Sequence, residues 1–324
     1  MLDDTRIITL EPDQIISEPG FYRIPIERHH NQPCNGVSVT SSVLRTMETH
    51  TPADVWAFHL LNRNRWVREE TDALLMGRAM ASFVEGGVGE LQRRFFVLPD
   101  DKPSRPTAKQ LAAIREGRGT DAGTHSVLFW QEVARDPRAE LTEKQWQLIL
   151  SMGNVARDDP GAQAALGGQP EITMAWWDDV NRLWCLSRPD QVSFSGMLSD
   201  YKKISTQGRP FNQAICDQRI TAHRYDMQMA FAAEGFEALT GHWPDQVGLV
   251  FQTDAPPHHV ILTSLTEEDL HIGEFHNRRA RARFRECLDA GYWPGPGEHV
   301  MAYRRPDYLR EKALEEMNME GTAP

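Results

Sequence analysis

Two aspartates and a lysine in the middle of the chain have the residue types and spacing of a site that cleaves phosphodiester bonds. Asp190 follows Pro189, and Asp200 and Lys202 lie two positions apart. Because residues two apart on a strand point to the same face, Asp200 and Lys202 are expected side by side. Carboxylate oxygens suit Mg²⁺, and a neighbouring lysine can orient or deprotonate the attacking water.

The segment around these residues is predicted to form two short strands with a turn near Ser195 and Gly196, because apolar and β-branched residues lie on both sides. Such a hairpin closes the ten-residue separation between Asp190 and Asp200. An Asp-x-Lys triplet alone is common, and its usual meaning is a solvated ion pair on a strand. The preceding Pro-Asp and the strand-turn-strand context favour the catalytic interpretation.

Other elements must position this hairpin. A strand over 171–177 is predicted to turn into another over 182–190, and a long helix over 212–234 then places Arg224 and Gln228 on one face. Thr51 is expected to cap a helix with Pro52 in its first turn. The remaining expected elements are helices near 41–48, over 69–85 with an end at Gly86-Gly87, and over 108–115, 142–157 and 266–290, and strands over 93–98, 246–253 and 259–264.

An arginine-rich run within the last long helix is a candidate surface for nucleic-acid phosphates. It has five arginines in the eight positions 278–285, and on a helix Arg278, Arg281 and Arg285 share a face. The alternative is a solvated face whose arginines pair with Glu267, Glu268, Asp269 and Glu274. The net charge of -11 does not exclude DNA binding, because net charge says little about a local groove.

The 324-residue chain has the composition of a soluble globular protein, with 40% hydrophobic and 25% charged residues. We predict a single α/β domain, with a mixed central sheet flanked by helices: a helical N-terminal elaboration over 1–68, a core over 69–290 and a tail over 291–324. The four cysteines are widely spaced and are expected to be reduced, buried thiols. Without a long apolar run or an apolar leader, the chain is expected in the cytoplasm, with no membrane partner.

These pieces together resemble the phage-type exonuclease VIII (RecE-like) branch of the PD-(D/E)xK nuclease superfamily. The central motif is written here Pro189-Asp190 … Asp200-x-Lys202. The other matching pieces are residues 39–44, 70–79, 96–99, 169–171 and 223–228, so that the resemblance covers about residues 20–290. It implies a restriction-endonuclease-like core, metal ligands at Asp190 and Asp200, a water-positioning role for Lys202, and a helix with Tyr225 and Gln228 lining the site.

One position departs from the pattern of that family. The family carries a histidine of the metal site four residues after the helix glycine, where this chain has Ala81 after Gly77. Glu85, one helical turn beyond, is a candidate third ligand; the alternative is a surface residue at the helix end. Glu171 is expected to pair with Arg188, although it could also lie near the metal ions. The other histidines, His258 and His259 among them, are expected to face solvent.

The resemblance implies a Mg²⁺-dependent exonuclease, with Mn²⁺ able to substitute. It would act 5′ to 3′ on linear double-stranded DNA and leave 3′ single-stranded tails for recombination in a bacterial or phage-infected cell. A homo-oligomeric ring around DNA and a single-strand annealing protein as partner are also implied. Arg224, Arg278, Arg281 and Arg285 are the predicted DNA contacts. The alternatives are an endonuclease or single-strand nuclease of defence or repair, and a degenerate fold that binds DNA without cutting.

Overall fold

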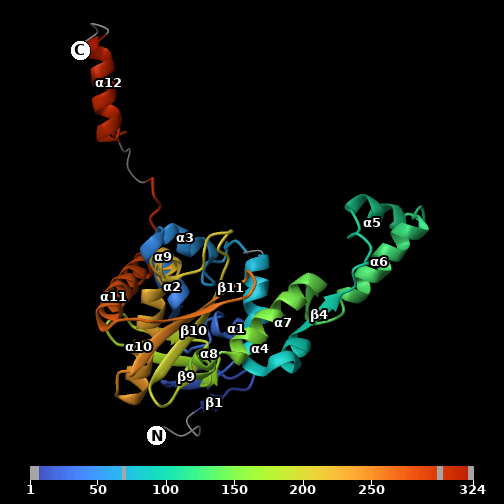
Figure 1. Ribbon diagram of the computed structural model, residues 1–324, viewed down its shortest axis with the longest axis horizontal. Helices are drawn as coiled ribbons and strands as arrows, with labels where there is room; N and C mark the ends of the chain where they lie inside the picture. The colour runs from blue at the N-terminus through green and yellow to red at the C-terminus, as the bar shows by residue number, and fades with distance from the viewer. Residues whose placement is uncertain (1–6, 68–70, 298–301, 320–324) are drawn as a thin grey trace.

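The computed structural model describes residues 7–67, 71–297 and 302–319. The acidic N-terminal segment 1–5, the predicted helix start at Glu69 and Glu70, and parts of the predicted tail lie outside these ranges. Figure 1 shows most of the described chain gathered around β-strands, with α5 (Ala108–Arg115) and α6 (Asp121–Val133) extending away on one side and α12 (Asp307–Met319) standing apart near the C-terminus.

The described residues form two five-stranded sheets and one pair of strands. The first sheet has the order β1 (Ile7–Thr9), β2 (Gly20–Arg23), β7 (Thr173–Asp178), β8 (Leu183–Ser187), β3 (Ser38–Thr40). The second has the order β12 (Val260–Ser264), β11 (Gln246–Thr253), β10 (Met197–Ile204), β9 (Gln191–Ser193), β6 (Gln169–Pro170). The separate pair is β4 (Phe95–Leu98) with β5 (Ala139–Thr142).

The predicted α/β class is confirmed, but the expected single sheet is divided in two. Both five-stranded sheets mix parallel and antiparallel pairs. The division falls at Pro189, which has no amide hydrogen to continue a ladder. Strand β8 therefore ends at Ser187 in the first sheet, and the chain enters the second sheet at β9.

Most helices pack around these strands, apart from α5, α6 and α12, and the helices largely match the predicted ranges. They are α1 (Ile26–His29), α2 (Ser41–Thr49), α3 (Pro52–Phe58), α4 (Asp72–Arg94), α5 (Ala108–Arg115), α6 (Asp121–Val133), α7 (Glu143–Asp158), α8 (Pro160–Ala165), α9 (Gln213–His223), α10 (Tyr225–Thr240), α11 (Glu267–Ala290) and α12 (Asp307–Met319). Thr51 caps α3 through a reciprocal bond pattern with Asp54, with Pro52 in the first turn, as predicted.

Two helix ends differ from the prediction. Gly86 and Gly87 interrupt α4 with non-helical torsions, but the chain resumes its helix and continues to Arg94. The predicted helix over 212–234 is two helices, α9 and α10, because Arg224 between them adopts a left-handed conformation with φ of 52°. This break turns the first residues of α10 toward β10, so local geometry decides where Tyr225 and Gln228 lie.

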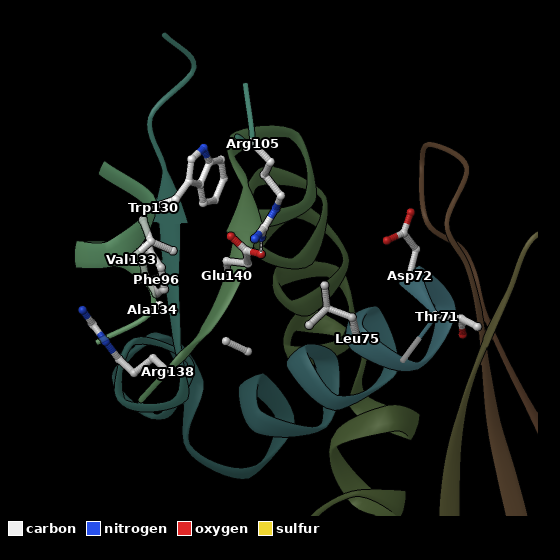
Figure 2. A pocket seen from close by; sticks show the side chains of 11 residues that line it. Thr71, Asp72, Leu75, Phe96, Arg105, Trp130, Val133, Ala134, Arg138 and Glu140 are labelled. Atoms are coloured by element: carbon white, nitrogen blue, oxygen red, sulfur yellow. Dashed lines mark hydrogen bonds and ion pairs between the residues drawn. The ribbon is translucent and has the colours of Figure 1, made fainter. Parts of the chain in front are cut away.

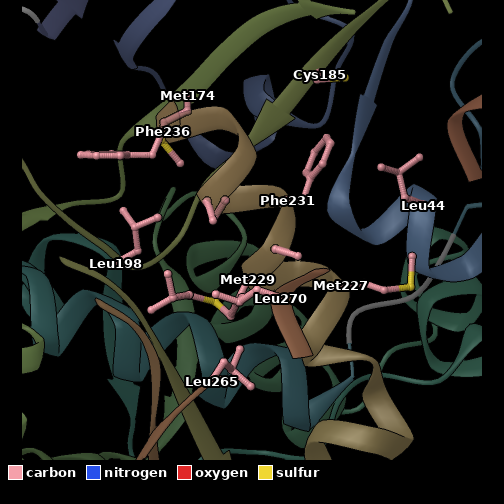
Figure 3. Packing of buried hydrophobic residues seen from close by; sticks show 14 of the residues in the cluster. Leu44, Met174, Cys185, Leu198, Met227, Met229, Phe231, Phe236, Leu265 and Leu270 are labelled. Atoms are coloured by element: carbon pink, nitrogen blue, oxygen red, sulfur yellow. The ribbon is translucent and has the colours of Figure 1, made fainter. Parts of the chain in front are cut away.

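The main core surrounds α10, which packs against strands of both five-stranded sheets. Figure 3 shows Met227, Met229, Phe231 and Phe236 of α10 among apolar side chains of other elements. These include Leu44 of α2, Met174 of β7, Cys185 of β8, Leu198 of β10 and Leu270 of α11. Burial on every side explains why α10 is apolar around its circumference and lacks a clear polar face.

Strand β10 separates this core from a smaller one. Leu198 and Ile204 face the core around α10, while Tyr201 packs against the cluster formed by α4 and α7. Alternation along a strand accounts for the division, since residues of even number lie on one face and those of odd number on the other. Asp200 and Lys202 consequently face α10.

The four cysteines are free and buried, which confirms the prediction. The prediction of solvent-facing histidines is wrong for His29, His59 and His258, which are buried. His258 lies against the end of β11, where its ring contacts the carbonyl oxygen of Thr253 at 3.3 Å. Among the described residues, no helix has both the length and the apolar character needed to cross a membrane.

Candidate active site

The hairpin of β9 and β10 brings Asp190 and Asp200 together as predicted. The antiparallel register pairs Ser199 with Gln191, so the next residues on each strand are the two aspartates. The backbone N–H of Asp190 donates to Asp200 Oδ1 at 3.4 Å, and the N–H of Tyr201 donates to Asp190 Oδ2 at 2.7 Å. Gly196 closes the turn with a φ of 99°, a conformation that favours glycine.

The Asp200 carboxylate is shielded from water, and Asp190 is partly buried. Asp200 is 2% exposed. Burial raises the pKa of Asp190 well above its usual value, and the neighbouring charges of Asp200 and Glu171 raise it further. A buried and a partly buried carboxyl group that repel one another are the arrangement that a divalent cation stabilises.

Lys202 forms an ion pair with Asp200, and both side chains lie on the face of β10 that was predicted for them. Its Nζ also lies 4.6 Å from the centroid of the Tyr225 ring, a cation–π distance. Burial lowers the pKa of Lys202, but the charges of Asp200, Tyr225 and Asp190 outweigh that effect and raise it overall. The lysine is therefore held as an ammonium beside the carboxylates.

Helix α10 supplies the opposite wall of the site. Gln228 Nε2 donates to Asp200 Oδ1 at 3.0 Å and fixes the orientation of that carboxylate. Tyr225 covers the lysine as described above. Arg224, a predicted DNA contact, instead donates to the carboxylate of Asp226 at 2.9 Å and occupies the break between α9 and α10.

Glu171 and Arg188 form the ion pair that was expected, with Nε to Oε2 at 2.5 Å. The side chain of Arg188 is nearly buried and also donates to the carbonyl oxygen of Ile24 at 2.6 Å. Arg188 therefore links Glu171 to the backbone that follows β2. The backbone N–H of Glu171 donates to the carbonyl of Asp190 at 3.1 Å. The pairing of Glu171 with Arg188 is confirmed, and the charge of Glu171 also raises the pKa of Asp190. A place for Glu171 near a metal ion stays a prediction.

A cleft of about 850 Å³ opens beside Asp190 and Glu171. Ala81 and Glu85 of α4 line the same cleft. The Glu85 carboxylate pairs with Arg94 at 2.6 Å. Within the described ranges, no three side chains of His, Cys, Asp or Glu are grouped so that they could hold a metal ion. Glu85 as a third ligand stays a prediction.

Arginines that sequence reasoning missed surround this cleft. They are Arg23 of β2, Arg78, Arg93 and Arg94 of α4, and Arg138 beside β5. The side chains of Arg93, Arg94 and Arg138 are 75%, 45% and 40% exposed. These arginines form no local run of charge from which the sequence could predict them, because they are distributed over 116 positions, from 23 to 138.

The predicted arginine surface on α11 is used differently. Arg281 is 4% exposed and lies between Asp178 of β7 and Glu234 of α10, with nitrogen–oxygen distances of 2.9 and 2.8 Å. A guanidinium enclosed in this way cannot contact DNA, and the prediction for Arg281 is corrected. Arg278 pairs with Glu274, as in the solvated-face alternative, and Arg285 pairs with Asp289.

A second hollow of about 430 Å³ lies where α4 meets the β4–β5 pair (Figure 2). Arg105 lies over the ring of Trp130, 4.1 Å from its centroid, and also pairs with Glu140. Arg138 lines both this hollow and the cleft that contains Asp190. The two cavities are therefore neighbours along one side of β5.

The chain is similar to a known protein family and to a solved structure. A family model described as a PDDEXK-like domain of unknown function matches residues 41–306. None of the curated proteins compared with the chain matches it. Among solved structures, a crystal structure at 2.19 Å of a candidate exonuclease from Eubacterium rectale is similar, with a TM-score of 0.59 and 14% sequence identity over 90% of this chain and 98% of that one.

The structural similarity, at that identity, concerns the fold. The superfamily of the predicted resemblance is confirmed, and its RecE-like branch stays a prediction. The motif residues, the fold and the family match agree with one another. This chain belongs to the family of PDDEXK-like domains of unknown function.

Proposed function

We propose that this protein is a metal-dependent nuclease that hydrolyses phosphodiester bonds of DNA. The observation that carries the proposal is the assembly of Asp190 with Asp200 and Lys202 of β10, where Gln228 and Tyr225 of α10 contact Asp200 and Lys202. A structural ion pair requires one carboxylate, whereas here the partly buried Asp190 is held beside the buried Asp200 and is repelled by it. Such a cluster costs folding free energy unless a ligand compensates for it.

The two aspartates fit a divalent cation. Asp190 and Asp200 would hold Mg²⁺ or Mn²⁺, which is commonly bound by one or two carboxylates together with water and substrate phosphate. When bound, the ion supplies stabilisation of the negative charge that builds on the attacked phosphate. Glu85 and the paired Glu171 are the further carboxylates that line the cleft nearby.

The protein side chains would perform the remaining work. The Lys202 ammonium donates a hydrogen bond to the attacking water and holds it near the phosphorus. Gln228 keeps Asp200 in one orientation through its amide hydrogen bond. Tyr225 limits the positions open to Lys202, because its ring covers the ammonium.

The arginine-lined cleft is the proposed path of the DNA. Arg78, Arg94 and Arg138 lie along the same cavity wall as Asp190 and would contact backbone phosphates. Arg224 is a further candidate beside Tyr225. Arg94, Arg138 and Arg224 are paired with carboxylates of the chain, as Arg278 and Arg285 are on α11. Arg78, Arg94 and Arg138 differ from the α11 pair in lining the cleft that contains Asp190. Local arginines of this kind reconcile a net charge of -11 with DNA binding.

We propose, as the more specific activity, 5′-to-3′ degradation of linear double-stranded DNA that leaves 3′ tails for recombination. A homo-oligomeric ring and a single-strand annealing partner belong to the same proposal. The support is the resemblance of the motif segments, and the E. rectale protein described as a candidate exonuclease has a similar fold. An exonuclease needs a DNA end, so it spares closed circular DNA.

Digestion of end-labelled DNA tests the proposal. Linear duplex labelled at either the 5′ or the 3′ end is incubated with Mg²⁺, Mn²⁺ or EDTA, with wild-type protein or Asp200→Asn. Metal-dependent release of the 5′ label that is absent in the variant supports the exonuclease. Cleavage of closed circular DNA would identify an endonuclease instead. DNA binding without any cleavage, by folded protein with metal present, would contradict the nuclease.

A further inference from the structure

Arg45 of α2 has a guanidinium that the protein leaves incompletely satisfied. Its Nη1 donates to the carbonyl oxygen of His223 at 3.0 Å. Its Nε is buried and has no hydrogen-bond partner. Among the residues that the structure describes, no carboxylate lies within ion-pair distance of Arg45. A buried donor without a partner destabilises the folded state, and more strongly when the group is charged.

This arginine lies at the edge of the candidate active site. Its Cζ is 5.9 Å from the centroid of the Tyr225 ring, whose face also contacts Lys202. The His223 ring stacks on Tyr225 at 5.3 Å, so Arg45, Lys202 and His223 surround one aromatic ring. The break between α9 and α10 creates this arrangement, because it ends α9 at the carbonyl that Arg45 contacts.

The nearby carboxylates already have other partners. Asp200 is bound by Lys202 and Gln228, and Asp226 is bound by Arg224. Burial lowers the pKa of Arg45, and the charges of Tyr225, Asp200 and Asp226 only partly oppose it. Two cations around one ring, of which only the lysine has a carboxylate partner, leave a site complementary to an additional anion.

We propose that Arg45 binds a backbone phosphate of the DNA strand, adjacent to the phosphodiester that is cleaved. This inference rests on the proposed nuclease function. A guanidinium presents several N–H groups in a fixed plane, which suits the oxygens of a phosphate. Arg45 is thus a positioning residue: it fixes the strand so that the scissile phosphate meets the Asp190–Asp200 pair and Lys202. The alternative is a purely structural bond that caps the end of α9.

Binding measurements separate these roles. Fluorescence anisotropy with a labelled linear duplex, in EDTA so that no cleavage occurs, gives the Kd over a range of salt concentrations. Arg45→Gln removes the charge but keeps an amide donor for the His223 carbonyl, and Arg45→Lys keeps the charge. Arg283→Ala is the matched control, since Arg283 of α11 also donates to a backbone carbonyl of α2, that of Met47 at 3.5 Å.

We expect Arg45→Gln to weaken binding about tenfold and to reduce the slope of log K against log salt by about 0.9, the value for loss of one phosphate contact. Arg45→Lys should keep most of the slope. In cleavage with metal, Arg45→Gln should raise KM and also lower kcat, because the strand is misplaced. Arg283→Ala should match wild type in affinity and slope, and thermal unfolding of each variant verifies its fold.

The inference is overturned if folded Arg45→Gln binds DNA with the affinity and salt slope of Arg283→Ala. It is also overturned if Arg45→Lys loses as much of the slope as Arg45→Gln, because charge would then be irrelevant. Failure of the nuclease proposal has a different signature: wild-type protein cuts no substrate with metal present. Salt-dependent binding that requires Arg45 would still support the phosphate contact in that case.

Discussion

Two charge-rich segments, the β9–β10 hairpin and helix α11, have opposite fates in the folded protein. In the hairpin, Asp190, Asp200 and Lys202 meet at one face of β10, where they form the candidate active site. In α11, the predicted DNA-binding arginines bind carboxylates of the protein itself, and Arg281 is enclosed by two of them. Side chains of a strand alternate between two faces, so Asp200 and Lys202 must share one. The partners of charged side chains on a helix depend instead on which elements pack against it.

Lys202 and Lys203 provide the strongest test of this contrast, because they are neighbours on opposite faces of β10. Lys202→Ala should lower kcat for DNA cleavage by about 10³-fold, a typical effect of removing a group that positions or stabilises reacting atoms. Lys203 pairs with Asp254 at 3.2 Å, and Lys203→Ala should keep cleavage within a few-fold of wild type. Steady-state rates of the two variants make the comparison. Equal losses would show that the face of the strand is irrelevant.

Arg281 tests the structural role of α11. Arg281→Ala leaves Glu234 and Asp178 without their buried partner, and breaking such a pair costs about 3–5 kcal/mol. Chemical denaturation should show this loss, while Arg285→Ala, one turn along the same helix, should change the free energy of unfolding by less than about 1 kcal/mol. A stable Arg281→Ala protein with weakened DNA binding would restore the original prediction for this residue.

A buried histidine beneath α11 provides a pH-dependent test of the same region. His59 packs against Phe284 of α11 with ring centroids 5.3 Å apart, and burial lowers its pKa from 6.5 to about 4. In the unfolded chain the His59 ring binds a proton near pH 6.5, whereas in the folded protein it does so only near pH 4. The free energy of unfolding therefore has its full value above pH 6.5. It decreases by up to about 3 kcal/mol as the pH falls toward 4.

Unfolding by urea at pH 7, 6 and 5 measures this loss, and His59→Gln is the control. The variant should lose less stability than wild type over the same interval, because it cannot take up that proton. Identical pH dependence in both proteins would show that His59 does not contribute.

The smallest expected effects compare arginines of the cleft with those of α11. Arg138→Ala should weaken duplex binding about tenfold and lower the salt slope by about 0.9, since its guanidinium lines the cavity beside Asp190. Both arginines are paired with a carboxylate, Arg138 with Asp136 and Arg278 with Glu274, but Arg278 does not line that cavity, and Arg278→Ala should change the Kd less than twofold. Anisotropy titrations in EDTA check both. The reverse order would place the DNA path along α11.

The sequence alone determined the features that depend on short-range chemistry. Thr51 and Pro52 began α3 because capping involves residues within one turn. Asp200 and Lys202 shared a face because a strand alternates regardless of its neighbours. The predicted hairpin placed Asp190 beside Asp200. The patterns of apolar residues predicted most of the strand and helix ranges.

Only the tertiary structure decided features that depend on distant partners. The cleft arginines come from β2, α4 and the segment before β5, so no local pattern could join them. The left-handed conformation of Arg224 separates α9 from α10, although the sequence pattern is compatible with one continuous helix. Arg45 lies at the edge of the candidate site because it donates to the carbonyl oxygen of His223 at the end of α9. Arg281 became buried because Asp178 and Glu234, 103 and 47 positions away, converge on it. Charge indicates that a side chain needs a partner, and the fold determines whether that partner is the protein or its substrate.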